Sequence, residues 1–516
     1  MGASSCGSAP HADQPSDGPA GLPGRGPEQP NARYGDSRLS MTKPRTTVLL
    51  TGATGNWGRA TLRELSSRSD RVTVLVLSLP GEKDKTVLSE FSAMENLDVV
   101  WGDLTDYATV ATCVARADVV LHVGAVVSPL ADEQPELATR VNVGSMRNII
   151  RAVKAQPDPS RISVVGVGSV AQTGNRNPPL HWGRVGDPIR VSQFDAYGQS
   201  KVTAERELVE AGLPKWVWLR QTGIFHPGML EIRDPIMTHS PFGGVMEWAS
   251  VEDSARLLAN LCEPDVPDEL WRGVYNIGGG EGWRLSNWQL QTAIGEAVGV
   301  KDIRKWYDRN WFALKNFHGQ WYTDSDRLHA LVPFRQDTFE GALCRAIATA
   351  PSSVKNAGQV PAWIVKHLVM KPLSRKPRGT MAAVRSGNDH EVRAHFGSLQ
   401  EWRSIGDWST FTPPAPSRTP SYLDHGYDED KPASEWSAID YLEAATFRGG
   451  RLLTEDVMPG LPSAPLMWSC GSGHEFAASP RLVLQAGHWC PTCTADPAGY
   501  RRQAEHNKFL AQVVDA

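Results

Sequence analysis

VLLTGATGNWG, at residues 48–58, decides the fold of this chain. A short apolar run leads into three glycines at every third position, and a helical pattern follows. Gly52, Gly55 and Gly58 allow a sharp turn, a close approach to a pyrophosphate and tight packing of helix on strand. The N-terminus of such a helix points its amide groups at the anion. The stretch predicts a dinucleotide-binding turn, although a glycine-rich turn without a ligand gives the same pattern.

A second pattern lies downstream, where YGQSK occupies residues 197–201 and Ser169 follows an apolar run at 162–165. Residues four apart share one face of a helix, so the Lys201 ammonium can sit near the Tyr197 phenol and lower its pKa. Ser169 could hydrogen-bond a reacting carbonyl while Tyr197 exchanges the proton and a nicotinamide takes or gives hydride. Alone, this spacing is also typical of a solvated helix face. Together with the glycine turn, it predicts a catalytic set of Ser169, Tyr197 and Lys201.

The order of these motifs resembles the extended short-chain dehydrogenase/reductase family, which includes nucleotide-sugar epimerases and 3β-hydroxysteroid-type dehydrogenases. The resemblance covers residues 46 to about 345 and includes GDLTD at 102–106, LHVGA at 121–125, VNVG at 141–144, SVAQTG at 169–174 and LRQTGI at 219–224. It implies a cofactor site formed by Gly52, Thr54, Gly55, Asn56, Trp57, Gly58, Ser78, Asp103, Leu104, Val123, Gly124, Ala125, Asn142, Tyr197, Lys201 and Thr222. It also implies a homodimer built through helices that flank the sheet.

Two departures from the family pattern bear on the reaction. Sugar-nucleotide 4-epimerases of the family usually carry an asparagine soon after the arginine of the nicotinamide strand, whereas Gln221-Thr222-Gly223 follows Arg220 here. The family's sugar dehydratases place an Asp-Glu pair after the catalytic serine, where this chain has Ala171-Gln172-Thr173. Dehydration is therefore disfavoured, and a sugar nucleotide is less secure as the substrate.

Three functions follow from this resemblance. The first is an NAD(P)-dependent oxidoreductase that interconverts a hydroxyl and a ketone on a small molecule. The second is an NAD-dependent, sugar-type epimerase in which hydride leaves and returns with no net redox change. The third is a nucleotide-sensing binding protein, against which the complete Ser-Tyr-Lys set argues, because a sensor needs no acid/base group. We expect the first.

The choice between NAD and NADP depends on the end of the second predicted strand, residues 72–78. An acidic side chain there would bind the ribose 2′-hydroxyl of NAD, and a basic one would accept the 2′-phosphate of NADP. Ser78 is neither. Lys83 and Lys85 follow in a loop that could reach a phosphate, but loop lysines are commonly only solvated. The sequence leaves both cofactors open.

The arrangement of the motifs predicts an α/β fold. Apolar runs of four to eight residues alternate with helical patterns from residue 48 to 224, as expected for a Rossmann-type, doubly wound parallel sheet. We divide the chain into a disordered tail (1–43), an extended dehydrogenase/reductase region with a smaller α/β substrate part (44–345), a helical or irregular connector (346–455) and a zinc-ribbon-like module (456–516). The tail is rich in Gly, Pro and Ser, and translation from Met41 would explain it equally well.

Four side chains near the predicted catalytic residues are candidates for contacting a substrate. His181 and Trp182 lie between Ser169 and Tyr197, in a long segment of the kind that often carries specificity. His318 and Trp321 belong to an aromatic-rich stretch at 311–322. That stretch is either an aromatic core cluster or a stacking wall for a flat substrate.

The C-terminal module carries the other clear chemical signal. Cys470 and His474 form one candidate knuckle, and Cys490 and Cys493 form another around Pro491 and Thr492. Three thiolates and one imidazole can close a tetrahedral zinc site, and a site without an open position is structural rather than catalytic. The segment is similar to short zinc-ribbon or treble-clef modules. The residues 482–484 between the knuckles read as strand-like.

Composition limits the partners. A net charge of −4 gives no reason to expect a nucleic-acid surface. No apolar run approaches the roughly 18 residues needed to cross a bilayer, and no leader pattern begins the chain. We therefore expect a cytoplasmic protein that acts on a small molecule, without a membrane or nucleic-acid partner.

Overall fold

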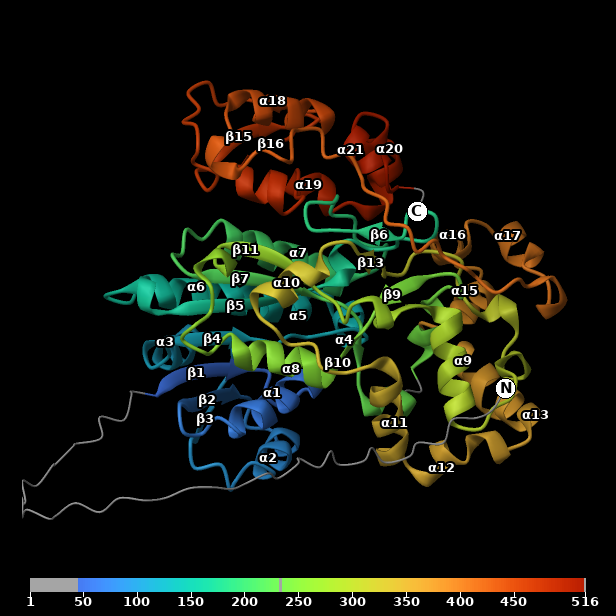
Figure 1. The fold of residues 1–516 in the computed structure, drawn as a ribbon. Coiled ribbons are helices and arrows are strands. Elements are labelled where there is room, and N and C mark those ends of the chain that lie inside the picture. Colours follow the sequence, from blue (N-terminus) through green and yellow to red (C-terminus); the bar gives the residue numbers. More distant parts are fainter. Residues whose placement is uncertain (1–44, 232–233, 515–516) are drawn as a thin grey trace, which may run out of the picture. The chain divides into compact units, whose positions relative to one another are not determined.

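A seven-stranded sheet forms the centre of the computed structural model, which describes residues 45–231 and 234–514 (Figure 1). All neighbouring strands are parallel, in the order β11-β7-β5-β4-β1-β2-β3. The strands are β1 (Thr46–Thr51), β2 (Val72–Ser78), β3 (Leu97–Trp101), β4 (Val119–His122), β5 (Ser163–Ser169), β7 (Trp216–Gln221) and β11 (Gly273–Ile277). The chain winds outward in both directions from β1, so the predicted Rossmann-type arrangement is confirmed.

Helices cover both faces of this sheet (Figure 1). On one face α1 (Asn56–Ser66) packs against α8 (Val251–Asn260), near α2 (Glu82–Ser89). On the other face α6 (Gly144–Lys154) packs between α3 (Tyr107–Ala115) and α7 (Ala196–Val209). The strands β1, β2 and β4 are largely buried on both faces, which is why they read as continuous apolar runs.

The carboxyl ends of the parallel strands share one edge of the sheet. Thr51, His122, Ser169 and Gln221 are the last residues of β1, β4, β5 and β7. The strand order reverses between β1 and β4, and ligands of such sheets bind in the crevice at this point. The predicted glycine turn and the predicted catalytic serine therefore lie on the same edge.

A smaller α/β region is built mostly from segments after α7, with β6 contributed by the segment before it. Its short strands pair as β6 with β13, β8 with β10 and β9 with β12. The strands are β6 (Trp182–Gly183), β8 (Ile224–Phe225), β9 (Val245–Glu247), β10 (Ala249–Ser250), β12 (Arg284–Ser286) and β13 (Trp321–Tyr322). The helices after α7 in this part of the chain are α9 (Asn287–Ala297), α10 (Ser325–Leu331) and α11 (Phe339–Thr349). Two short helices, α4 (Leu130–Glu133) and α5 (Pro135–Ala138), lie earlier, between β4 and β5.

Residues 346–437 add short helices that pack on the smaller region. They are α12 (Ser352–Lys355), α13 (Ala362–Ile364), α14 (Lys371–Ser374), α15 (Thr380–Ser386), α16 (Asp389–Phe396) and α17 (Leu399–Ser404). Met381, Trp402 and Trp408 share a hydrophobic cluster with Phe242 and Trp311. No helix among the described residues is both long and apolar enough to span a bilayer.

Residues 438–511, which begin before the predicted boundary at 456 and are called the C-terminal module below, combine a three-stranded antiparallel sheet with short helices. The module contains α18 (Ala438–Phe447), β14 (Arg451–Leu452), β15 (Leu466–Ser469), β16 (Glu475–Ala478), α19 (Pro491–Thr494), α20 (Tyr500–Ala504) and α21 (Lys508–Ala511). The strand-like reading of 482–484 is wrong, because Arg481–Gln485 forms a π-helical turn. Leu482 and Trp468 share a hydrophobic core with Ala204 and Leu208 of α7, so the module covers that helix.

The described residues from Arg45 onward belong to one compact unit. The predicted disordered tail, residues 1–43, lies outside the described residues.

Candidate functional site

The glycine turn after β1 is packed so closely that two of its positions exclude a side chain. Gly52 has a φ of +71°, and a Cβ there would lie 2.6 Å from the Cα of Gly124. A Cβ on Gly58 would lie 2.1 Å from the carbonyl oxygen of Gly52. Gly55 precedes α1, and no side chain of the described residues caps that helix end. The turn thus presents bare backbone and uncapped amide groups, as a dinucleotide pyrophosphate requires.

The end of β4 lies directly against this turn. The Gly124 amide donates to Thr51 Oγ1 at 3.0 Å, and Thr51 Oγ1 is 2.9 Å from His122 Nδ1. Burial lowers the pKa of His122 to about 3, so its ring is neutral and bridges Thr51 and Ser145. Two cofactor candidates, Val123 and Ala125, flank Gly124 and are half-buried at this edge. Leu104 reaches the same place, since its Cδ1 would be 2.9 Å from a Cβ on Gly124.

Asn142 ties the loop after β4 to the helix that carries Tyr197. Its Oδ1 accepts from the amide of Val126 at 2.7 Å, and its Nδ2 donates to the carbonyl oxygen of Val126 at 2.9 Å. The same Nδ2 lies 2.9 Å from Ser200 Oγ in α7. Asn142 therefore fixes the spacing between the predicted cofactor strand and the predicted catalytic helix.

Ser169, Tyr197 and Lys201 come together at the strand ends. Ser169 ends β5, and its hydroxyl hydrogen-bonds the phenol of Tyr197. Lys201 Nζ lies 5.9 Å from the centre of the Tyr197 ring and donates to the carbonyl oxygen of Val167 at 2.8 Å. Asp195 is the N-cap residue of α7 and accepts from the Gly198 amide at 2.7 Å, which orients the first turn of the helix.

The electrostatics of the three groups differ from the expectation drawn from spacing alone. Burial raises the pKa of the Tyr197 phenol above its ordinary value, with Ser169 opposing this effect and Asp195 adding to it. Burial also lowers the pKa of Lys201 to about 8. The phenol therefore holds its proton in this state, while the ammonium is only partly protonated in mildly alkaline solution.

The remaining predicted cofactor residues occupy the same edge. Ser78 ends β2, and Asp103 accepts from the Thr105 amide at 2.8 Å in the loop after β3. Thr222, just past β7, donates its hydroxyl to the carbonyl oxygen of Glu247 at 2.5 Å. Lys85 pairs with Glu82 on α2 at 2.9 Å.

Two residues near the glycine turn were not found by sequence reasoning. Asp84 on α2 accepts a hydrogen bond from Thr54 Oγ1 at 2.6 Å, which brings a carboxylate to the turn. His226, after β8, lies 3.3 Å from Asn56 Nδ2. Asp84 follows the end of β2 by six positions, so it lies outside the strand end where an acidic cofactor-binding residue is expected. Nothing in the sequence near His226 indicates its contact with Asn56.

A cavity of about 330 Å³ opens beside the N-terminus of α7. Its lining includes Asp132, Asp195, His239, His318, Arg378 and His395. Asp132 accepts from the Ala196 amide at 3.2 Å, so the cavity adjoins the residue that precedes Tyr197. Arg378 is 3.3 Å from Asp132, and the buried His395 has no hydrogen-bond partner at Nδ1 among the described residues. The lining also contains Glu133 and Glu391, which gives it an excess of carboxylates.

The four predicted substrate residues separate into two groups. His318 lines the cavity and lies 3.8 Å from Asp195. His181, Trp182 and Trp321 are at most 3% exposed and pack as one aromatic cluster, in which the rings of Trp182 and Trp321 are 5.5 Å apart. Only His318 among the four faces a space that could admit a ligand.

A cluster of four metal-binding side chains lies in the C-terminal module. Cys470, His474, Cys490 and Cys493 place their ligand atoms within 4.8 Å of one another. Cys470 Sγ is 3.7 Å from Cys493 Sγ, and His474 Nδ1 is 3.4 to 3.5 Å from all three sulfurs. Tetrahedral zinc with bonds of about 2.0 and 2.3 Å places its ligand atoms about 3.5 to 3.8 Å apart. The residues thus fit a closed zinc site.

His488 is not part of this cluster, although it stands only two residues before Cys490. Its Nε2 is instead 3.0 Å from Glu205 in α7. Trp489 packs between Trp468 and Phe476.

The order of the parallel strands and the glycine turn after β1 place this chain in the class of Rossmann-fold proteins. Residues 48–217 match the model of the NAD dependent epimerase/dehydratase family. This match lies within the region in which the motifs resemble the extended short-chain group.

Two curated proteins and one solved structure are similar to parts of this chain. The 3 beta-hydroxysteroid dehydrogenase type 7 of Mus musculus is 28% identical over 215 residues, covering 40% of this chain and 57% of the relative. The Homo sapiens protein of that name is 29% identical over 199 residues, covering 36% and 52%. The chain thus spans about half the length of these curated relatives. The structure of a dTDP-glucose 4,6-dehydratase from Bacillus anthracis in complex with NAD is 15% identical, covering 64% of this chain and 99% of that one, with a TM-score of 0.47.

Proposed function

We propose that this protein is an NAD-dependent oxidoreductase that interconverts a hydroxyl and a ketone on a small molecule. The observation that carries the proposal is the meeting of Ser169, Tyr197 and Lys201 on the sheet edge that also holds the glycine turn. A protein that only sensed a nucleotide would need the turn and not the acid/base group.

Each of the three side chains has a distinct role in this reaction. Tyr197 gives its proton to the ketone oxygen during reduction, and the raised pKa keeps that proton in place until substrate arrives. The Ser169 hydroxyl bonds the phenol in this structure, and it donates its one proton to the reacting oxygen instead when substrate is bound, which fixes the position of that oxygen. Lys201, held by Val167, supplies positive charge that stabilises the phenolate formed when the proton leaves. The bound dinucleotide supplies or accepts the hydride.

Asp84 favours NAD over NADP. Its carboxylate accepts from Thr54 in the glycine turn. A negative charge at this position can accept a hydrogen bond from a ribose hydroxyl, and it repels a 2′-phosphate. Lys85, the residue that could have favoured a phosphate, is paired with Glu82.

The substrate site in this proposal is the cavity beside α7. One lining residue, Asp132, bonds the amide of Ala196, the neighbour of Tyr197 in the sequence. His318 and His395 offer imidazole groups to hydroxyl or carbonyl oxygens. Asp132, Glu133, Asp195 and Glu391 outnumber the single arginine, Arg378. Such a lining suits an uncharged or cationic molecule better than a nucleoside diphosphate, whose charge it would repel.

Cys470, His474, Cys490 and Cys493 bind a structural zinc ion in this proposal. The four side chains leave no coordination position for water, so the ion stabilises the module and takes no part in the redox chemistry. Cytoplasmic location, where thiols stay reduced, is compatible with this role.

The decisive variant is Tyr197→Phe, with Tyr307→Phe as the same change at a buried tyrosine in another hydrophobic cluster. Loss of the phenolic proton should lower kcat by about 1,000-fold or more and leave the dinucleotide Kd within about twofold. Tyr307→Phe should leave kcat unchanged. Equal activity of Tyr197→Phe and the native protein would reject the assignment. Following nicotinamide absorbance also separates the two reactions, because an epimerase turns over substrate without accumulating NADH.

A further inference from the structure

Glu205 occupies an unusual position on the catalytic helix. Tyr197, Lys201 and Glu205 are spaced by four residues, so all three lie along one side of α7. Glu205 has no exposed surface, yet its carboxylate takes no part in the chemistry proposed above. A buried carboxylate needs charged or hydrogen-bonding partners to offset its loss of hydration.

The partners of Glu205 come from three separate segments. Gln172 Nε2 donates to Oε2 at 2.5 Å, and Arg220 makes a two-pronged contact at 2.6 and 3.0 Å. His488 Nε2, from the C-terminal module, lies 3.0 Å from Oε1. Burial raises the pKa of Glu205, but Arg220 and His488 outweigh it and bring the pKa to about 2. The carboxylate is therefore ionised and joins the three segments.

One branch of this network leads to the catalytic serine. Gln172 donates to Glu205 through Nε2 and accepts from the Ser169 amide through Oε1 at 2.9 Å. The Ser169 hydroxyl in turn accepts from the Ala171 amide at 3.2 Å. A Cβ on Gly168 would lie only 2.2 Å from Gln172 Oε1, so the backbone leaves this glutamine little freedom. The position of Gln172 therefore determines where Ser169 points.

The other branch leads to the Cys/His module. Arg220 Nη2 donates to the carbonyl oxygen of Ala486 at 2.6 Å, beside the contact of His488 with Glu205. The C-terminal module also forms hydrogen bonds near both ends of α7. Gln199 Nε2 donates to the carbonyl oxygen of Thr494 at 3.0 Å, and the Ser479 hydroxyl donates to Glu210 at 2.6 Å.

We propose that Glu205 is a positioning residue, through which His488 and the metal-binding module hold Gln172 and Ser169 in their catalytic arrangement. This inference rests on the proposed function for its kinetic consequence. In this proposal the C-terminal module affects the reaction at the edge of the seven-stranded sheet. Loss of the His488 contact, or of the metal, makes the segment that carries Ser169 more mobile. Turnover falls as a result, while the glycine turn keeps its affinity for the dinucleotide.

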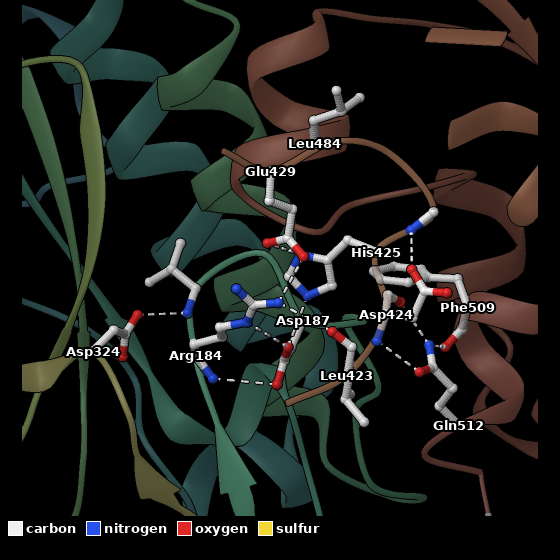
Figure 2. Close-up of polar contacts among 12 residues, drawn as sticks. Arg184, Asp187, Asp324, Leu423, Asp424, His425, Glu429, Leu484, Phe509 and Gln512 are labelled. Carbon is white, nitrogen blue, oxygen red and sulfur yellow. Dashed lines mark hydrogen bonds and ion pairs between the residues drawn. The ribbon is translucent and has the colours of Figure 1, made fainter. Parts of the chain in front are cut away.

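The chain offers a matched control in a second buried cluster (Figure 2). Asp187 pairs with Arg176 at 3.0 Å and with His425 Nε2 at 2.9 Å, and it accepts from the Arg184 amide at 3.2 Å. Asp187 and His425 are each 1% exposed. This cluster also joins a segment before α7 to the C-terminal part of the chain. In the described part of the chain, none of these partners is bonded to Ser169, Tyr197 or Lys201.

The test compares three variants: His488→Ala, His488→Gln and His425→Ala. In His488→Ala we expect kcat to fall about tenfold, with the dinucleotide Kd changed less than about twofold, because the reacting groups are misplaced and the nucleotide site is not. Amide hydrogen exchange over residues 168–173 should rise about tenfold in the same variant. His488→Gln should restore both, since its side-chain amide nitrogen replaces imidazole Nε2. His425→Ala should lower the melting temperature about as much as His488→Ala does. It should leave kcat and the amide exchange of residues 168–173 unchanged.

A second experiment removes the metal from the native protein with a chelator, with metal content measured directly. The same exchange over residues 168–173 should rise and should reverse when zinc is restored. The positioning role is overturned if His488→Ala and His425→Ala affect kcat and exchange alike, or if His488→Gln fails to rescue. Absence of Tyr197-dependent turnover in the native protein would reject the proposed function instead, and the exchange results would still decide whether Glu205 transmits the contact.

Discussion

The nucleotide edge of the sheet and the Cys/His cluster are built by opposite means. At the sheet edge the main chain makes the site: Gly52 and Gly58 lie where no side chain fits. In the cluster the side chains of Cys470, His474, Cys490 and Cys493 make it, and the surrounding backbone only brings them within 4.8 Å. Nucleotide binding at the glycine turn should therefore be lost when atoms are added there. Metal binding at the Cys/His cluster should be lost when ligand atoms are removed.

The largest effect should follow removal of a ligand from the cluster. Cys490→Ser should abolish binding of about one zinc per chain and lower the free energy of unfolding by on the order of 5 kcal/mol, since metal binding and folding are coupled. Metal analysis and denaturant unfolding would measure both. Cys262→Ser provides the comparison, because Cys262 is a buried free thiol away from the cluster. Full metal content in Cys490→Ser would show that the cluster is not the binding site.

The next effect should follow the addition of one methyl group to the glycine turn. Gly58→Ala places a Cβ 2.1 Å from the Gly52 carbonyl oxygen, so the turn must move. We expect the Kd for NAD to weaken by about 100-fold. Gly144→Ala is the control, because a Cβ there meets nothing within 4 Å. Titration of NAD into both variants measures the difference, and equal affinities would remove the turn from the site.

Side chains at the nucleotide edge of the sheet should change the rate of the reaction more than the affinity for the dinucleotide. The pH dependence of kcat tests this expectation for Lys201. Its ammonium deprotonates with a pKa of about 8, so kcat should fall about tenfold per pH unit above that value. Lys201→Met should be slow and lack this pH dependence. A flat profile in the native protein would contradict the role assigned to the ammonium.

The contribution of Lys201 to the free energy of unfolding should rise with pH, whereas its contribution to kcat falls. Its folded pKa, about 8, lies below its ordinary value of 10.5, so the folded state disfavours the charged form. This cost is fully present below pH 8 and is lost as the pH rises toward 10.5. The free energy of unfolding of the native protein should therefore gain a rising component in that window, which Lys201→Met should lack.

The smallest effect should follow neutralisation of Asp84. Asp84→Asn removes one partly exposed charge beside Thr54, and the ratio of kcat/KM for NAD to that for NADP should fall about fivefold. Glu82→Gln changes a neighbouring exposed charge that pairs with Lys85 and should leave the ratio unchanged. An unaltered ratio in Asp84→Asn would place cofactor selection elsewhere.

Much of the fold was predictable because local patterns determine it. Apolar runs separated by helical patterns predicted the parallel sheet, and the glycine turn predicted where β1 meets α1. The four-residue spacing of Tyr197 and Lys201 predicted a shared helix face. The Cys and His spacings likewise predicted the cluster, because each knuckle is a short local turn.

Other features depend on contacts between distant segments and were not predictable. Residues 482–484 are apolar at three consecutive positions, so periodicity could not distinguish a strand from the buried helical turn that forms. The contact of His488 with Glu205 spans 283 positions and leaves no mark in spacing. The aromatic stretch around Trp321 fitted both a core and a substrate wall, and only burial places Trp321 in the interior.

The covering of α7 by the C-terminal module has a consequence for assembly. Ser479, Leu482, His488 and Thr494 pack along or bond to this helix, so its outward face is occupied within a single chain. A second copy could not pair through α7 without first displacing those residues. A two-subunit particle would have to associate through some other surface, and scattering or sedimentation of the native protein would reveal whether one forms.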